Sequence, residues 1–206
     1  MSGIIAQNTL DNSGLIKSPA AGGAWNFIKK LTASTSATLS FVDGTSDVVL
    51  DSTYKEYLFT FKDIHPGTDN VDFTFNMSID SGSNYNVTKT DTYGRAMHNE
   101  ADDATDLSYD TDGDVIQSTD FAMLAKSVGA DADQMVAGYL YLYTPSNTTY
   151  AKHWISNMQV SQQGDYSMQV LKGGYGNTTT AVDACQFKMS SGNIDAGDIC
   201  LYGVTT

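Results

Sequence analysis

Residues 71–79 alternate apolar and polar side chains without interruption, and this stretch constrains the fold more than any other. Its apolar positions are Val71, Phe73, Phe75, Met77 and Ile79. Because neighbouring side chains of a β-strand point to opposite faces, the pattern predicts a strand with one apolar and one polar face. Residues 54–64 repeat the pattern and the link 65–70 consists of turn formers, which predicts an antiparallel pair. Such a pair is marginal in water, so its apolar face requires a second apolar layer from the rest of the chain.

Similar short segments recur along the chain and are separated by turns rich in Gly, Asn, Asp and Ser. They are residues 25–32, 37–42, 48–50, 85–90, 93–98, 134–143, 150–160, 166–175, 184–189 and 195–204. This spacing favours an all-β domain, a two-sheet antiparallel β-sandwich or jelly roll. Residues 99–120 are acidic and are predicted to form a long loop.

One short helix is predicted over residues 118–128. Phe121, Leu124 and Ala125 have the spacing of one helical face. Capping residues and an aspartate stand at its start, and a glycine follows its end. The complete prediction is therefore an all-β domain with a single short helix.

Residues 1–24 differ from the rest of the chain and sustain no hydrophobic period. We expect an extended N-terminal arm that precedes a β-domain over residues 25–206. The arm is either a disordered terminus or a docking segment that orders on a neighbouring subunit. In the second case its assembly anchors are Ile4, Ile5, Leu15 and Ile16.

The chain carries a net charge of −13 and has a pI of about 4.2. A carboxylate-rich surface repels phosphate, so the composition disfavours nucleic acid and anionic lipid as partners. No stretch is apolar enough to predict membrane insertion, and the N-terminus lacks the pattern of a signal peptide. We therefore expect synthesis in a cytoplasm, where Cys185 and Cys200 usually stay free; a cross-strand disulfide is the alternative.

One motif suggests metal binding. Asp110, Asp112 and Asp114 place carboxylates at positions one, three and five of a loop, as a hard cation such as Ca²⁺ requires. The motif departs from a calcium loop because Gly113 stands at position four and Phe121 at position twelve. The alternative is an acidic loop in solvent, and no other cofactor is expected. The three histidines are isolated and no nucleophile motif occurs, so we expect no enzymatic activity.

The second candidate site is aromatic. Tyr139, Tyr141 and Tyr143 share one face of the segment 134–143, and Trp154 follows in the next predicted strand. Aromatic rings on a β-face stack on sugars in lectin-like domains, so these four residues are candidates for glycan binding. The alternative is packing between sheets or between subunits.

Four stretches together resemble uncharacterised virion structural proteins of marine tailed bacteriophages. They are FVDGTSDVVLDSTYKEYLFTFKDIHPGTDN, HNEADDATDLSYDTDGD, YLYTPSNTTYAKHW and FKMSSGNIDAGDICLYGV. The resemblance spans residues 25–206 and brings no catalytic motif. No heptad, collagen or β-helix repeat is present, so the chain differs from a long fibre shaft.

The resemblance implies a non-enzymatic virion protein, made in the host cytoplasm and displayed on the particle surface. It would act as a decoration protein or as the knob of a short fibre, anchored by its arm to capsid or tail proteins. Homo-oligomers are common among such parts, and a trimer is expected. The alternative is a receptor-recognition module that binds host-surface glycans at the tail tip; a depolymerase-type hydrolase is a third hypothesis.

Overall fold

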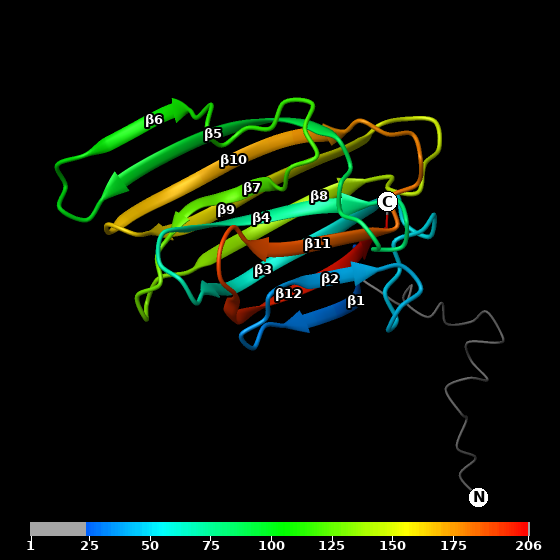
Figure 1. The fold of residues 1–206 in the computed structure, drawn as a ribbon, viewed down its shortest axis with the longest axis horizontal. Helices are drawn as coiled ribbons and strands as arrows, with labels where there is room; N and C mark the ends of the chain where they lie inside the picture. The colour runs from blue at the N-terminus through cyan, green and yellow to red at the C-terminus, as the bar shows by residue number, and fades with distance from the viewer. Residues whose placement is uncertain (1–23, 206) are drawn as a thin grey trace, which may run out of the picture.

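The computed structural model describes residues 24–205, which form twelve antiparallel β-strands and, within that range, no helix (Figure 1). No segment of this range forms a helix that could span a membrane. The strands are β1 (Trp25–Thr32), β2 (Leu39–Val42), β3 (Glu56–Pro66), β4 (Val71–Ser78), β5 (Lys89–Asn99), β6 (Thr105–Tyr109), β7 (Ala122–Val128), β8 (Val136–Tyr143), β9 (Lys152–Gln162), β10 (Tyr166–Gly176), β11 (Ala184–Met189) and β12 (Ile194–Val204).

All the strands belong to one hydrogen-bonded sheet, whose main path runs β1-β12-β3-β8-β9-β7-β4-β11-β2. The path curves back on itself into a nearly closed, barrel-like shape. A side branch, β10-β5-β6, extends from β9 and projects beyond the barrel at the top of Figure 1. The two walls of the barrel meet where β9 and β7 share a single pair, Val128 with Gln162. The predicted separation into two sheets is therefore incomplete, because β9 pairs with three strands.

Aromatic side chains fill the space between the walls. Phe187 of β11 lies 5.2 Å from both Phe59 and Phe61 of β3, measured between ring centroids. Its ring also contacts those of Phe73 and Phe75 on β4, at 6.1 and 6.2 Å. All five rings are buried, so the sheet closes around an aromatic core in which ring pairs add to the hydrophobic term.

The alternating segments do form strands, but the predicted pairing of 54–64 with 71–79 is wrong. β3 pairs with β12 and β8, whereas β4 pairs with β11 and β7. The link between β3 and β4 crosses from one wall to the other, and the two apolar faces meet across the core, with Phe61 and Phe73 5.3 Å apart. Alternation specifies which face of a strand is apolar, and it does not specify the neighbouring strand.

The predicted helix over residues 118–128 is also wrong, since most of this segment is β7, which pairs with β4. The register between the two strands shifts twice. Consequently the fully buried residues of β7 are Ala122, Leu124, Ala125 and Val128, a spacing that imitates a helical face. The predicted acidic loop 99–120 contains a further strand, β6, on the edge of β5.

Cys185 and Cys200 are free thiols, so the disulfide alternative is wrong. Burial raises the pKa of the Cys185 thiol to about 12, which leaves this group neutral. The proposed arm anchors Ile4, Ile5, Leu15 and Ile16 lie outside the described residues.

Candidate functional site

Seven consecutively paired strands, β1, β12, β3, β8, β9, β10 and β5, form a broad wall. We call the side of this wall that faces away from the core the outer face. The register aligns one row of outward-pointing residues across all seven strands. The row is Phe27, Tyr202, Leu58, Tyr141, Ile155, Gly173 and Thr92.

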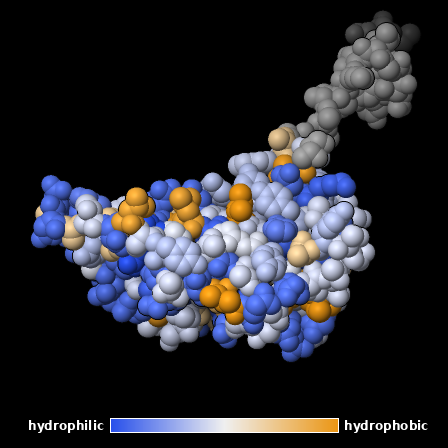
Figure 2. All heavy atoms as spheres, turned by 90° about the horizontal axis from the view of Figure 1, so that it is seen from above, coloured by the Kyte–Doolittle hydropathy of each residue, from blue (hydrophilic) through white to orange (hydrophobic). Residues whose placement is uncertain are grey.

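The outer face is rich in exposed aromatic and aliphatic side chains. The exposed fraction is 60% for Phe27, 47% for Ile155 and 56% for Leu171. The ring of Tyr202 lies 5.7 Å from Phe27 and 5.9 Å from Trp25, so the aromatic surface continues to the edge strand. Figure 2, seen from above the molecule of Figure 1, shows apolar residues as separate orange groups among polar ones. Aromatic side chains are enriched at protein–protein interfaces, which makes this face a candidate interaction site.

The tyrosine stripe lies on this face. Tyr139, Tyr141 and Tyr143 follow one another along β8, with ring centroids 5.7 and 6.2 Å apart. Tyr139 is exposed, and the other two are partly exposed. Burial raises the pKa of the Tyr143 hydroxyl, with a further contribution from Glu56. Tyr141 and Tyr143 are stacked, with 12° between their planes, whereas Tyr139 meets Tyr141 edge-on at 75°.

Trp154 does not belong to the stripe, and its proposed contact with glycans is wrong. It points into the core, is 1% exposed, and packs edge-on against Phe75 at 4.7 Å. Its neighbour Ile155 takes the outward position on β9. The prediction missed Trp25, Phe27 and Leu171, because an alternating strand does not show which of its faces is covered.

The outer face differs from the whole chain in charge. The charged side chains at its paired positions are two lysines, one glutamate and one aspartate, which sum to zero, whereas the chain carries −13. They are Lys30, Lys62, Glu56 and Asp198. Asp198 bonds to Lys30 at 3.2 Å and to the hydroxyl of Thr32. Most of the acidity therefore lies elsewhere on the molecule, and a negatively charged partner or a second copy meets little repulsion here.

The acidic motif forms a different structure from a calcium loop. The carboxylate of Asp110 lies 2.9 Å from both Lys126 Nζ and Arg95 Nη1, and Asp114 accepts a hydrogen bond from the Tyr109 hydroxyl. Burial opposes ionisation of Asp110, but the bonds to this carboxylate outweigh it and lower its pKa. Within residues 24–205 no three His, Cys, Asp or Glu side chains are grouped to hold a metal ion. The structure therefore does not bring Asp110, Asp112 and Asp114 together as ligands.

Buried lysine side chains donate hydrogen bonds to backbone carbonyls in and beside this loop. Lys172 Nζ donates to the Gly113 carbonyl at 2.6 Å, and Lys89 Nζ donates to the carbonyls of Asp120 and Val87. Lys172 and Lys89 are almost fully buried. Burial lowers the pKa of both amines, to about 8 for Lys89, against the opposing effect of Asp91. These contacts could not be predicted from the sequence, because an isolated lysine in a strand usually faces solvent.

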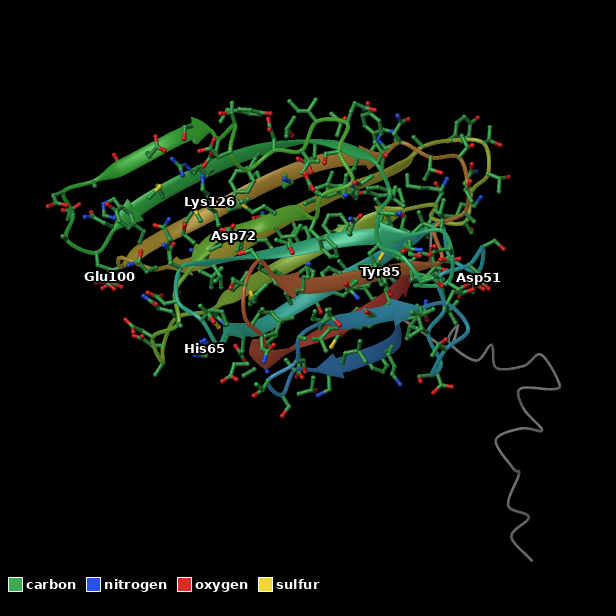
Figure 3. The ribbon with its side chains drawn as sticks, viewed as in Figure 1. Asp51, His65, Asp72, Tyr85, Glu100 and Lys126 are labelled. Carbon is green, nitrogen blue, oxygen red and sulfur yellow. The ribbon has the colours of Figure 1, made fainter. Side chains whose placement is uncertain are left out.

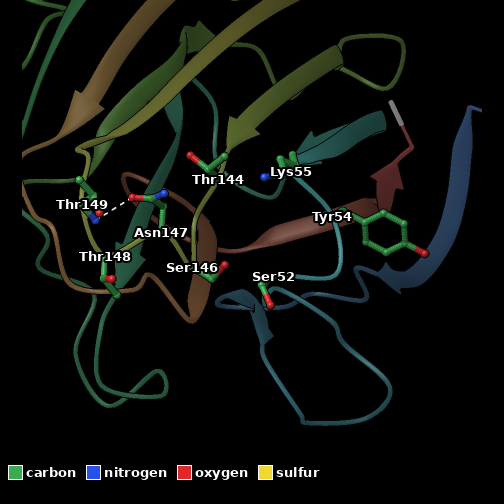
Figure 4. Close-up of a pocket in the computed structure, with 8 residues that line it drawn as sticks. All are labelled: Ser52, Tyr54, Lys55, Thr144, Ser146, Asn147, Thr148 and Thr149. Carbon is green, nitrogen blue, oxygen red and sulfur yellow. Dashed lines mark hydrogen bonds between the residues drawn. The ribbon is translucent and has the colours of Figure 1, made fainter.

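The remaining hollows and titratable groups are dispersed. A hollow of about 250 Å³ between the segment before β3 and the loop after β8 is lined mainly by hydroxyl and amide groups (Figure 4). Its one charged side chain is Lys55, and Asn147 Oδ1 accepts the Thr149 backbone N–H there. Figure 3 shows His65 and Glu100 toward the side of the molecule opposite Asp51.

No family model matches the chain, and comparisons with curated proteins and with solved structures give no significant match. The resemblance to phage virion proteins stays a prediction. The functional inference therefore rests on the outer face and on the residues that surround it.

Proposed function

We propose that this chain is a non-enzymatic structural protein displayed on the surface of a tailed-phage virion, as a decoration protein or a short-fibre knob. The observation that supports it most is the outer face, which is aromatic and formally neutral on a chain of net charge −13. Such a surface suits contact with another protein, and aromatic residues are enriched at interfaces.

The proposal assigns different roles to the two parts of the chain. Residues 1–24 are the docking arm, with Ile4, Ile5, Leu15 and Ile16 as anchors on capsid or tail proteins. The β-domain begins with β1, whose Trp25 and Phe27 lie on the outer face, so the arm joins the domain beside that face. Neighbouring copies, in a trimer by our proposal, pack through it.

The finer fold assignment is also a proposal. We infer that the fold is a variant of the two-sheet sandwich or jelly roll, because the two walls of the barrel pack face to face across an aromatic core. The contact between Phe61 and Phe73 is an example of this packing.

Deletion of residues 2–22 tests the role of the arm. We expect the truncated protein to fold with an unchanged circular dichroism spectrum and to be absent from particles assembled in a complementation assay. A matched variant replaces Ile4, Ile5, Leu15 and Ile16 by serine and retains the length of the arm. Normal incorporation of both variants would refute the docking role.

A second candidate function is glycan binding at the tail tip, which the exposed tyrosine stripe favours. Rings aligned along a strand can stack on successive sugar units. A glycan array with fluorescent protein tests it, with Tyr141→Ala expected to lose binding. Tyr150→Ala is the control, since Tyr150 is 68% exposed and lies in the loop between β8 and β9 rather than on a strand of the outer face. Equal binding by both variants would exclude the stripe.

A further inference from the structure

Asp91 of β5 and Lys172 of β10 meet on the inner side of the wall. Their strands are adjacent and antiparallel, and Lys172 Nζ lies 2.8 Å from Asp91 Oδ1. Neither side chain exposes any surface to solvent. The residue opposite Asp91 is Gly174, where a Cβ atom would lie 2.4 Å from the Cβ of Asp91, so glycine leaves room for the carboxyl group. The pair is therefore held together out of contact with bulk solvent.

The hydrogen bonds around this pair are unequal. Asp91 Oδ1 also accepts the backbone N–H of Val115 at 2.8 Å, whereas Oδ2 is buried without any hydrogen-bond partner. Lys172 Nζ donates to the Gly113 carbonyl at 2.6 Å and lies 5.1 Å from the centroid of the Tyr93 ring. A carboxylate with one unpaired oxygen is poorly stabilised as an ion at this depth.

Burial acts on both partners in the direction of the neutral forms. It raises the pKa of the Asp91 carboxyl and lowers the pKa of the Lys172 amine, against the attraction between the two charges. Proton transfer within the pair gives a carboxylic acid beside an amine with a free lone pair. These are the two forms that react to give an amide.

We propose that Asp91 and Lys172 condense into an amide that covalently links β5 to β10. The Lys172 nitrogen attacks the Asp91 carboxyl carbon, a C–N bond forms, and the bond from that carbon to Oδ2 breaks. Starting from the ion pair, the nitrogen loses two of its three hydrogens, and both leave on Oδ2 as water. Atoms and charge balance without an oxidant, a reductant or a cofactor.

The surrounding backbone suits both the reaction and its product. The Val115 N–H is already directed at Oδ1, where negative charge develops during the attack. The hydrogen that remains on the nitrogen keeps its bond to the Gly113 carbonyl. Fixing the two groups on paired strands removes the entropic cost of bringing them together. Lys89 does not compete, because its Nζ donates to the carbonyls of Val87 and Asp120 instead.

The crosslink would close the chain between residues 91 and 172 into a covalent loop. That loop contains the acidic segment and strands β6 to β9. Constraining a long loop reduces the entropy of the unfolded chain and so opposes unfolding. The inference goes beyond the proposed function, because the bond forms within one chain whatever surface the protein occupies.

Intact-mass spectrometry of the purified, denatured full-length chain tests the proposal. We expect the wild-type mass to be one water molecule, about 18 Da, below the mass calculated for the linear chain without a crosslink. Lys172→Arg keeps the positive charge and is expected to show no deficit. Lys126→Arg, which alters the partly exposed pair with Asp110, is the matched control and is expected to retain the deficit.

A protease digest locates the lost water. The expected product is a branched peptide in which the segment containing Asp91 is joined to that containing Lys172. A wild-type mass equal to that calculated for the linear chain overturns the proposal, and this result requires no variant to fold. A deficit located at Asp112-Gly113 marks a succinimide instead, and also overturns it.

Discussion

Strands β4 and β8 carry the same alternation of apolar and other residues, but loops cover the outward face of only one of them. On β4 the polar residues Thr74, Asn76 and Ser78 are buried. Asn76 Nδ2 donates to the carbonyl of Tyr85 at 2.7 Å and to that of Thr119 at 2.9 Å, so two loops lie over this face. On β8 the tyrosine stripe has no such cover.

Whether a strand face is exposed to solvent therefore depends on the loops that cover it, and not on the polarity of its side chains. A covered polar face stabilises the fold only while each of its groups has a hydrogen-bond partner. An open aromatic face contributes less to stability and remains available to a partner. Substitutions on the two kinds of face should therefore differ in the property that they change.

The largest contrast is expected within β9, where Trp154 faces the core and Ile155 faces outward. Trp154→Ala should lower the free energy of unfolding by about 3–5 kcal/mol, because it leaves a cavity beside Phe75. Ile155→Ala should change it by roughly 0.5 kcal/mol. Urea unfolding measures both, and similar losses would contradict the assignment of the two faces.

A smaller loss is expected from the covered polar face. Asn76→Ala leaves the buried carbonyls of Tyr85 and Thr119 without their donor, which should cost about 1–3 kcal/mol. Asn157→Ala on the outer face is the matched control, since Asn157 only accepts an exposed bond from Gln169. Its expected cost is roughly 0.5 kcal/mol. If the two variants lose similar amounts of the free energy of unfolding, the loops do not cover the polar face of β4.

Local features of this fold could be predicted from the sequence, whereas its long-range pairing could not. β1 and β11 begin and end at the predicted residues, because the alternation that defines a strand is a property of neighbouring residues. The partners of β3 and β4 are set by contacts far along the chain. The helical spacing in β7 arises from its shifted register against β4, which no local pattern reveals.

In the candidate sites, too, features within one strand could be predicted from the sequence, and features that depend on pairing between strands could not. The tyrosine stripe could be predicted because it lies on one strand. Its extension to Phe27 and Leu171 depends on register across several strands. The pair of Asp91 with Lys172 requires that β5 and β10 be neighbours, although many residues separate them along the chain. The spacing of the carboxylates suggested calcium in the acidic loop, where the structure instead has lysine side chains beside Asp110 and the Gly113 carbonyl.

A pH-dependent effect should distinguish a covered lysine from an open one. The pKa of Lys89 is about 8 in the folded protein, because of burial, against 10.5 for an ordinary lysine. Between these values the unfolded chain binds more protons, so this group adds stability as pH rises through that window. The free energy of unfolding of Lys89→Met should therefore fall progressively behind that of wild type from pH 8 upward. Curves for Lys89→Met and wild type that run parallel across this window would contradict the shift.

The smallest effect on stability, and the largest on association, is expected from the open face itself. Tyr141→Ser combined with Leu171→Ser should change the free energy of unfolding by about 1 kcal/mol or less, because both side chains lie on the surface. Sedimentation velocity of the full chain should show that the variant loses the self-association expected of wild type. Tyr150→Ser is the control, because Tyr150 is 68% exposed and lies in the loop between β8 and β9. If the variant associates like wild type while Tyr150→Ser does not, the contact surface is on the loop side of the molecule, and the neutral aromatic face has another use.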